Sequence, residues 1–102
     1  MSSAERAKVF KALSDPKRVD IIDTLAAHGQ MCGTELANHL GISLALLSHH
    51  WEVLIDAGLC RKDREGQLRY CSLNVERLRE ATDWCQDKCS DSKKRKTKLT
   101  PA

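Results

Sequence analysis

The chain has 102 residues, 4% aromatic content and a formal net charge of +3, which allows one domain with a modest, mostly aliphatic core. No apolar run approaches the roughly 20 residues of a bilayer-spanning helix, and the first ten residues carry no apolar signal segment, so we expect a cytoplasmic protein. The sequence also holds no nucleophile with a neighbouring base, no phosphate loop and no paired carboxylates, so we do not expect an enzyme.

Two helices are predicted in the first 28 residues. The first covers 4–13. Asp15 followed by Pro16 is a strong helix start, an N-cap with proline at the first helical position, and the second helix then runs over 17–28. The predicted core faces hold Ala7, Phe10 and Leu13 on the first helix, and Val19, Ile22, Leu25 and Ala26 on the second.

A short helix, a turn and a longer helix follow over 34–40 and 44–57. Gly41 ends the shorter helix, Ser43 caps the longer one, and Gly58 ends it. Helical spacing predicts a buried stripe on the longer helix that consists of Leu47, Trp51 and Leu54, with His50 on the packed face as well.

Two paired strands are predicted over 59–63 and 68–73, joined by a Glu65-Gly66 turn. This turn would pair Arg64 with Gln67 and place Cys60 opposite Cys71. Asn74 then caps a last helix over 75–89, whose inner stripe holds Leu78, Ala81 or Thr82, Cys85 and Cys89.

The charge changes at the end of the chain. Residues 91–102 hold five Lys or Arg against one Asp, whereas residues 1–90 hold twelve basic and thirteen acidic side chains. We therefore expect a domain over 1–90 and a basic disordered tail over 91–102, and any affinity of the domain for DNA must come from local placement of charge.

This order of elements predicts a mainly helical winged helix-turn-helix with a small β-hairpin wing. In such a fold the first half of the helix after the turn enters the major groove, and basic side chains on the wing contact phosphates. The candidate DNA contacts are Ser43, Leu44, Ala45, Ser48 and His49 on the helix, and Lys62, Arg64, Gln67 and Arg69 on the wing, where Arg61 is also basic. Because side chains alternate along a strand, not all of the wing residues can face the DNA. The alternative is a helical module that binds protein rather than DNA.

Four stretches carry a resemblance to a known family. They are residues 13–18 (LSDPKR), residues 31–36 (MCGTEL), residues 47–50 (LSHH), and Gly58-Leu59 leading to Gly66-Gln67 and Tyr70. Together they resemble the ArsR/SmtB family of bacterial winged-helix repressors. The resemblance implies a homodimer built on the first and last helices, which binds an inverted repeat and leaves it when an inducer binds. The chain departs from the family at Leu44-Ala45, where members often carry polar residues.

The five cysteines raise the question of what the protein senses. Their odd number excludes complete pairing within one chain, and structural disulfides are rare in the cytoplasm. The resemblance implies that Cys32 lies where thiolate-using members carry a metal or redox cysteine. Cys85 and Cys89 lie on adjacent turns of one helix face, which suits two thiolates on one soft ion better than a direct disulfide.

These residues leave two sensing hypotheses open. In the first, peroxide or reactive sulfur oxidises Cys32, and a disulfide to Cys85 or Cys89 connects the start of the helix-turn-helix to the last helix, which takes part in the expected dimer. In the second, a thiophilic ion such as arsenite or cadmium binds Cys32, Cys85 and Cys89. The resemblance implies that zinc-sensing members place Asp, His and Glu ligands along the last helix; a zinc site of that type is not expected here, since residues 75–89 contain no histidine. Cysteine as a small apolar filler is the remaining interpretation, and it is the one we prefer for Cys60 and Cys71.

Overall fold

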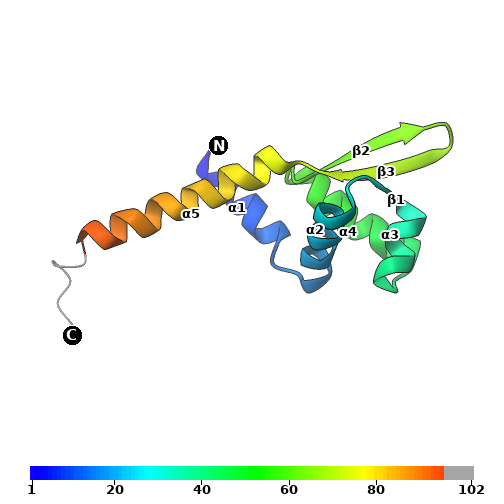
Figure 1. The fold of residues 1–102 in the computed structure, drawn as a ribbon, viewed down its shortest axis with the longest axis horizontal. Coiled ribbons are helices and arrows are strands. Elements are labelled where there is room, and N and C mark those ends of the chain that lie inside the picture. Colours follow the sequence, from blue (N-terminus) through cyan, green and yellow to red (C-terminus); the bar gives the residue numbers. More distant parts are fainter. Residues whose placement is uncertain (96–102) are drawn as a thin grey trace.

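The computed structural model describes residues 1–95 and shows a mainly helical domain with one small antiparallel sheet (Figure 1). The elements in chain order are α1 (Ser3–Ala12), α2 (Pro16–His28), β1 (Met31–Cys32), α3 (Gly33–Leu40), α4 (Leu44–Asp56), β2 (Cys60–Glu65), β3 (Leu68–Leu73) and α5 (Val75–Arg95). The winged helix-turn-helix predicted from the sequence is confirmed: α3 and α4 form the helix pair, and the β2–β3 hairpin forms the wing.

Local capping sets the helix boundaries, as the sequence predicts. The Asp15 carboxylate accepts the backbone N–H groups of Lys17 and Arg18 at 2.8 and 3.4 Å, and the Ser43 hydroxyl accepts the N–H of Leu46 at 3.1 Å. Gly41 ends α3 in the left-handed conformation, with φ of +67°. These short-range contacts fix the angle at which α4 leaves the turn.

The buried faces of α1 and α2 differ from the prediction. On α2, Ile22 and Leu25 are buried as predicted, but Ile21 and Thr24 complete the face, whereas Val19 is 40% exposed and Ala26 lies outside. On α1 the buried residues are Val9 and Ala12 instead of Ala7 and Phe10. Each helix offers two overlapping apolar stripes, and the tertiary contacts select one of them.

The core lies where α2, α3, α4 and the base of the wing meet. Its fully enclosed side chains are aliphatic or small, as the low aromatic content predicts, and include Ile21, Leu25, Leu36, Leu47, Leu54 and Leu59. Trp51 and His50 are also buried, which confirms the packed face predicted for α4.

The sheet has three strands in the order β1-β3-β2, and β1 was not predicted. The predicted register of the wing is wrong. Glu65 pairs with Leu68, so the turn residues are Gly66 and Gln67, and Cys60 lies opposite Leu73 instead of Cys71. The physical reason is the turn. Gly66 takes the first central position with φ of +64°, and no non-glycine residue in the described part of the chain needs a positive φ.

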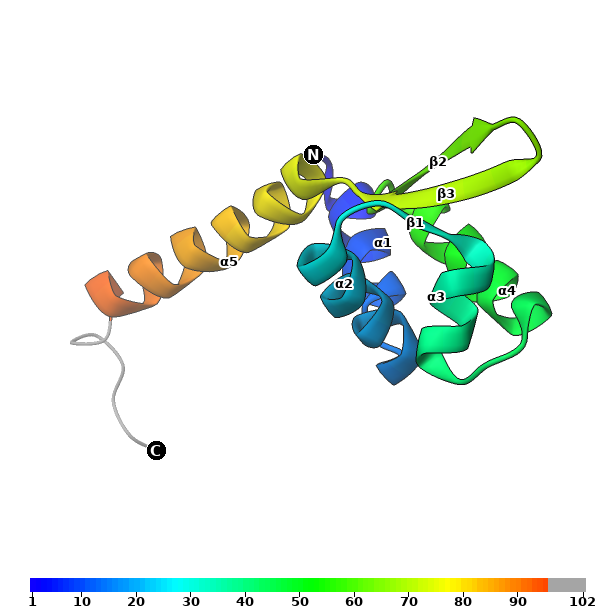
Figure 2. The ribbon, with the colours of Figure 1, turned by 45° about the vertical axis from the view of Figure 1, so that its right-hand side comes forward.

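Helix α5 leaves the body of the domain and extends along its longest axis (Figures 1 and 2). It is helical to Arg95, so the predicted tail over 91–102 began too early; residues 96–102 lie outside the described residues. Midway along α5, the Trp84 ring lies 5.8 Å from that of Phe10 on α1, and the Arg6 guanidinium lies 5.0 Å above it. Among the described residues, none of the helices has the length and apolar character needed to cross a membrane.

Candidate DNA interface

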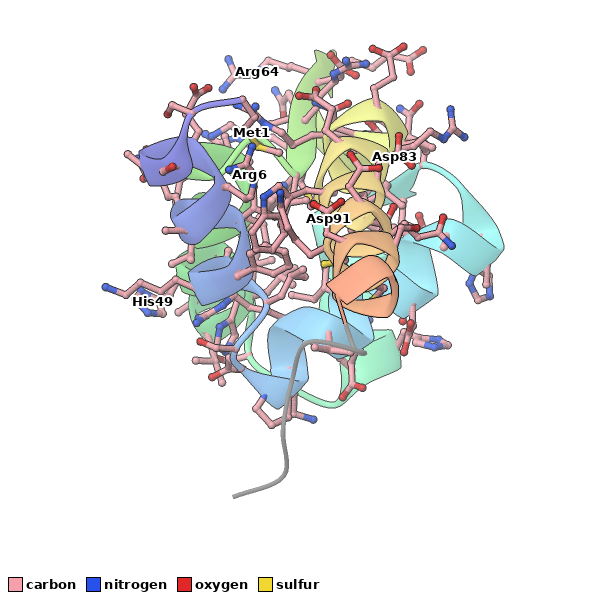
Figure 3. The ribbon with its side chains drawn as sticks, turned by 90° about the vertical axis from the view of Figure 1, so that its left-hand side faces the viewer. Met1, Arg6, His49, Arg64, Asp83 and Asp91 are labelled. Atoms are coloured by element: carbon pink, nitrogen blue, oxygen red, sulfur yellow. The ribbon has the colours of Figure 1, made fainter. Side chains whose placement is uncertain are left out.

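The first half of α4 presents an exposed face of mixed chemistry. Ser43, Ala45, Ser48 and His49 are exposed, and Leu44 is 51% exposed. Figure 3 shows His49 pointing away from the body of the domain. The five helix residues predicted to contact DNA therefore all lie on the open side of α4. Leu46, 42% exposed, joins this face and was missed, because its spacing also suits the core.

The wing gathers its positive charge on one face. Lys62 lies opposite Cys71, and Arg64 lies opposite Arg69, so Lys62, Arg64 and Arg69 share the face that continues from the buried Cys71. Arg61 points to the other face and donates to the Asn74 side chain at 3.5 Å. Like charges directly opposite each other destabilise a ribbon, so an anion bound against Arg64 and Arg69 would relieve their mutual repulsion.

A groove of about 310 Å³ separates the wing from the α3–α4 pair. It brings together five of the nine predicted DNA contacts, which are Leu44, Ser48, Lys62, Gln67 and Arg69. An ion pair of 3.3 Å between Lys62 and Glu52 links its two walls. The helix and the wing thus form one continuous surface on both sides of this groove.

Cys32 lines the same groove. It is the N-cap residue of α3 but its side chain makes no capping hydrogen bond, and it is half-buried. The pairing of Cys32 with Tyr70, between β1 and β3, brings the start of α3 to the base of the wing. This proximity was not visible in the sequence, because it depends on the short strand β1.

Cys60 and Cys71 form a separate, buried pair of thiols. All five cysteines are free, and these two are 3% and 0% exposed. A hydrogen bond with Cys60, then burial, then the nearby charge of Cys60 together raise the pKa of the Cys71 thiol far above its usual range. Because the thiolate is the reactive form, this shift disfavours reaction at Cys71, in agreement with its predicted role as a wing-core residue.

The cysteines of α5 lie far from Cys32. Cys85 is half-buried and Cys89 is exposed, one turn apart on α5. In Figure 1 the orange end of α5 and the β1–α3 junction occupy opposite ends of the long axis. In the described residues no group of three or more His, Cys, Asp or Glu side chains is arranged to hold a metal ion. A single chain therefore does not bring Cys32 together with Cys85 and Cys89, either as a disulfide or as a metal site.

Comparison with known proteins agrees with this geometry. The sequence profile described as "bacterial regulatory protein, arsR family" matches residues 15–62. The transcriptional repressor SdpR of Bacillus subtilis (strain 168) is 41% identical over 76 residues, which cover 74% of this chain and 83% of the relative. A cadmium resistance transcriptional regulatory protein CadC homolog of Staphylococcus aureus is 40% identical over 77 residues, covering 76% of this chain and 64% of the relative. Among solved structures, a homodimeric winged helix-turn-helix DNA-binding domain from Mycobacterium bovis has a TM-score of 0.71 at 27% identity, covering 87% of this chain and 81% of that one.

Proposed function

The chain belongs to the ArsR family of bacterial transcriptional regulators, and from that premise we propose that it is a homodimeric repressor released from its operator when Cys32 is oxidised. It would act on double-stranded DNA in the cytoplasm. The observation that carries the proposal is the groove in which Cys32 lies beside Ser48, Lys62 and Arg69.

The DNA side of the proposal follows from exposure and charge. The α4 residues Ser43, Ser48 and His49 offer hydrogen-bonding groups to base edges or phosphates, and Leu44 and Ala45 offer apolar contacts to thymine methyl groups. Lys62, Arg64 and Arg69 supply phosphate contacts from one face of the wing. The phosphate backbone between the two would then follow the groove.

The proposed dimer uses α1 and α5. Phe10 on α1 is 37% exposed although it contacts the half-buried Trp84 of α5, which leaves part of this aromatic pair open to a second copy. A related structure is homodimeric. Two-fold symmetry would present two α4 helices to half-sites about one DNA turn apart, which suits an inverted repeat.

The switch would act locally. The Cys32 thiolate attacks one oxygen of a peroxide, the O–O bond breaks, hydroxide leaves, and the sulfur becomes a sulfenic acid. With polysulfide, the Cys32 thiolate would instead attack a terminal sulfur, break its S–S bond and release a polysulfide shorter by one sulfur, which leaves a persulfide on Cys32. Each product places a bulkier, more polar group in the groove that the backbone phosphates would follow. No rearrangement of the dimer is needed, in contrast to a Cys32 disulfide with Cys85 or Cys89.

A second candidate is a repressor that responds to a thiophilic ion such as cadmium or arsenite. The similarity to a cadmium resistance regulator favours it. Within one chain Cys32 is the cysteine at the groove, so Cys85 and Cys89 would have to come from another copy to complete such a site.

Operator release from the parent, Cys32→Ser and Cys89→Ser proteins separates these candidates. Cys89 is the matched control, because it is an exposed thiol remote from the groove. We expect peroxide or polysulfide to release the parent and Cys89→Ser proteins reversibly, with full recovery on reduction, and to leave Cys32→Ser bound. Release by cadmium or arsenite alone would establish the second candidate, and oxidant release of Cys32→Ser would overturn the assignment of Cys32.

A further inference from the structure

Arg18, in the first turn of α2, connects α1 to α4. Its Nε donates to the backbone carbonyl of Ala12, at the end of α1, at 2.6 Å. Its Nη1 lies 3.2 Å from Nδ1 of His50 on α4. A guanidinium is a rigid planar fork, so one side chain fixes these two partners relative to each other.

The chemistry of the pair fixes which group donates and which accepts. Arginine has only hydrogen-bond donors, so Nδ1 of His50 must accept from Arg18. This hydrogen bond therefore requires the tautomer of His50 with its proton on Nε2. His50 is 7% exposed and Arg18 is half-buried, so this hydrogen bond is partly shielded from solvent.

Asp15, the N-cap residue of α2, is hydrogen-bonded to the backbone of Arg18. Its carboxylate accepts the backbone N–H groups of Lys17 and Arg18 at 2.8 and 3.4 Å. Burial acts to raise the pKa of Asp15, but the N–H groups of Lys17 and Arg18 and the positive charge nearby outweigh it, and the pKa is lowered. Asp15 is thus ionised and balances the charge of Arg18.

We propose that Arg18 is a positioning residue that sets the rotation of α4 for DNA reading. Neighbouring residues on a helix point about 100° apart, so anchoring His50 also fixes the direction of Ser48 and His49 on the exposed side. Because its other partner is the end of α1, Arg18 ties the recognition helix to the proposed dimer helix. The inference rests on the proposed function, since it requires that α4 reads DNA.

The test compares operator and non-specific affinity in matched variants. The operator probe is a duplex selected by the parent protein from a randomised pool, and the non-specific probe is a scrambled duplex of equal length. Arg18→Lys keeps the charge but cannot hold both partners. His50→Leu removes the acceptor, whereas His50→Asn keeps an acceptor near the position of Nδ1. Lys17→Met is the control, because Lys17 is the neighbouring cation and donates to the Leu40 carbonyl at 3.4 Å.

We expect Arg18→Lys and His50→Leu to lower the operator-to-scrambled affinity ratio by roughly ten-fold or more, as for a lost hydrogen bond to a charged group. His50→Asn should restore most of the ratio, and Lys17→Met should lower both affinities together. An unchanged ratio in a folded Arg18→Lys protein would overturn the proposal. So would a ¹⁵N spectrum of the parent with the His50 proton on Nδ1, which needs no variant to fold. If the parent selects no duplex at all, the proposed function fails instead.

Discussion

Ser43 combines two roles in one hydroxyl group. Its oxygen caps α4 by accepting the N–H of Leu46, and the same side chain lies on the exposed face that we assign to DNA. Residue type alone does not reveal such a combination, just as it does not distinguish the groove-lining Cys32 from the buried Cys71. The environment of each thiol decides its role. Cys32 lies at a helix start beside Lys62 and Arg69, whereas Cys71 is buried where the wing meets the core.

Substitutions at Ser43 separate the two roles. Ser43→Ala should lower the free energy of unfolding by about 1 kcal/mol through loss of the cap. Ser43→Asp keeps the cap but adds a negative charge toward the phosphates, so stability should stay near that of the parent while operator affinity falls roughly ten-fold or more. Chemical denaturation and DNA titration measure the two effects. A Ser43→Asp protein that binds the operator as tightly as the parent would place Ser43 away from the DNA.

The wing shows how one register decides a whole surface. With Glu65 opposite Leu68, the ribbon carries Lys62, Arg64 and Arg69 on one face and Arg61 on the other. Alternation was predicted from the sequence, but the choice of the binding face needed the partner strand and the packing of Cys71. The start of α3 joins this surface because strand β1, which precedes it, pairs with β3.

The salt dependence of DNA binding tests that face. Each phosphate contact contributes about −0.9 to the slope of log K against log salt concentration. Arg64→Gln and Arg69→Gln should each reduce the magnitude of the slope by about 1, whereas Arg61→Gln, on the opposite face, should leave it unchanged. Affinity measured over a range of salt concentrations gives the slope. An equal loss in all three variants would mean that the wing acts only as diffuse positive charge.

The whole molecule is elongated, with principal extents of 59 × 24 × 24 Å, because α5 projects from the domain. A projecting helix with a half-buried Trp84 and an open aromatic partner on α1 is incompletely covered in one chain. The arrangement suits a two-fold assembly in which both copies bury these faces.

A charge on that face should separate the copies. Phe10→Asp is expected to give a monomer at micromolar concentration and to weaken operator binding about 100-fold or more, since the second half-site no longer adds to affinity. Val19→Asp is the control, because Val19 is similarly exposed, at 40%, on α2. Sedimentation equilibrium and circular dichroism would show association and folding. Dimers that persist in Phe10→Asp, or dissociate equally in both variants, would contradict the α1–α5 interface.

The sequence by itself determined what depends on neighbours in the chain. Asp15-Pro16, Gly41, Ser43 and Asn74 define where helices start or stop, because caps and glycine conformations act within one turn. With the hydrophobic spacing of α4, they were enough for the fold and for the exposure of the five helix residues predicted to contact DNA. Tertiary structure decided the contacts between distant segments: the buried faces of α1 and α2, the strand β1, the wing register, and the link from Arg18 to His50. Each depends on which of several chemically similar surfaces packs best, and that choice is made by shape in three dimensions.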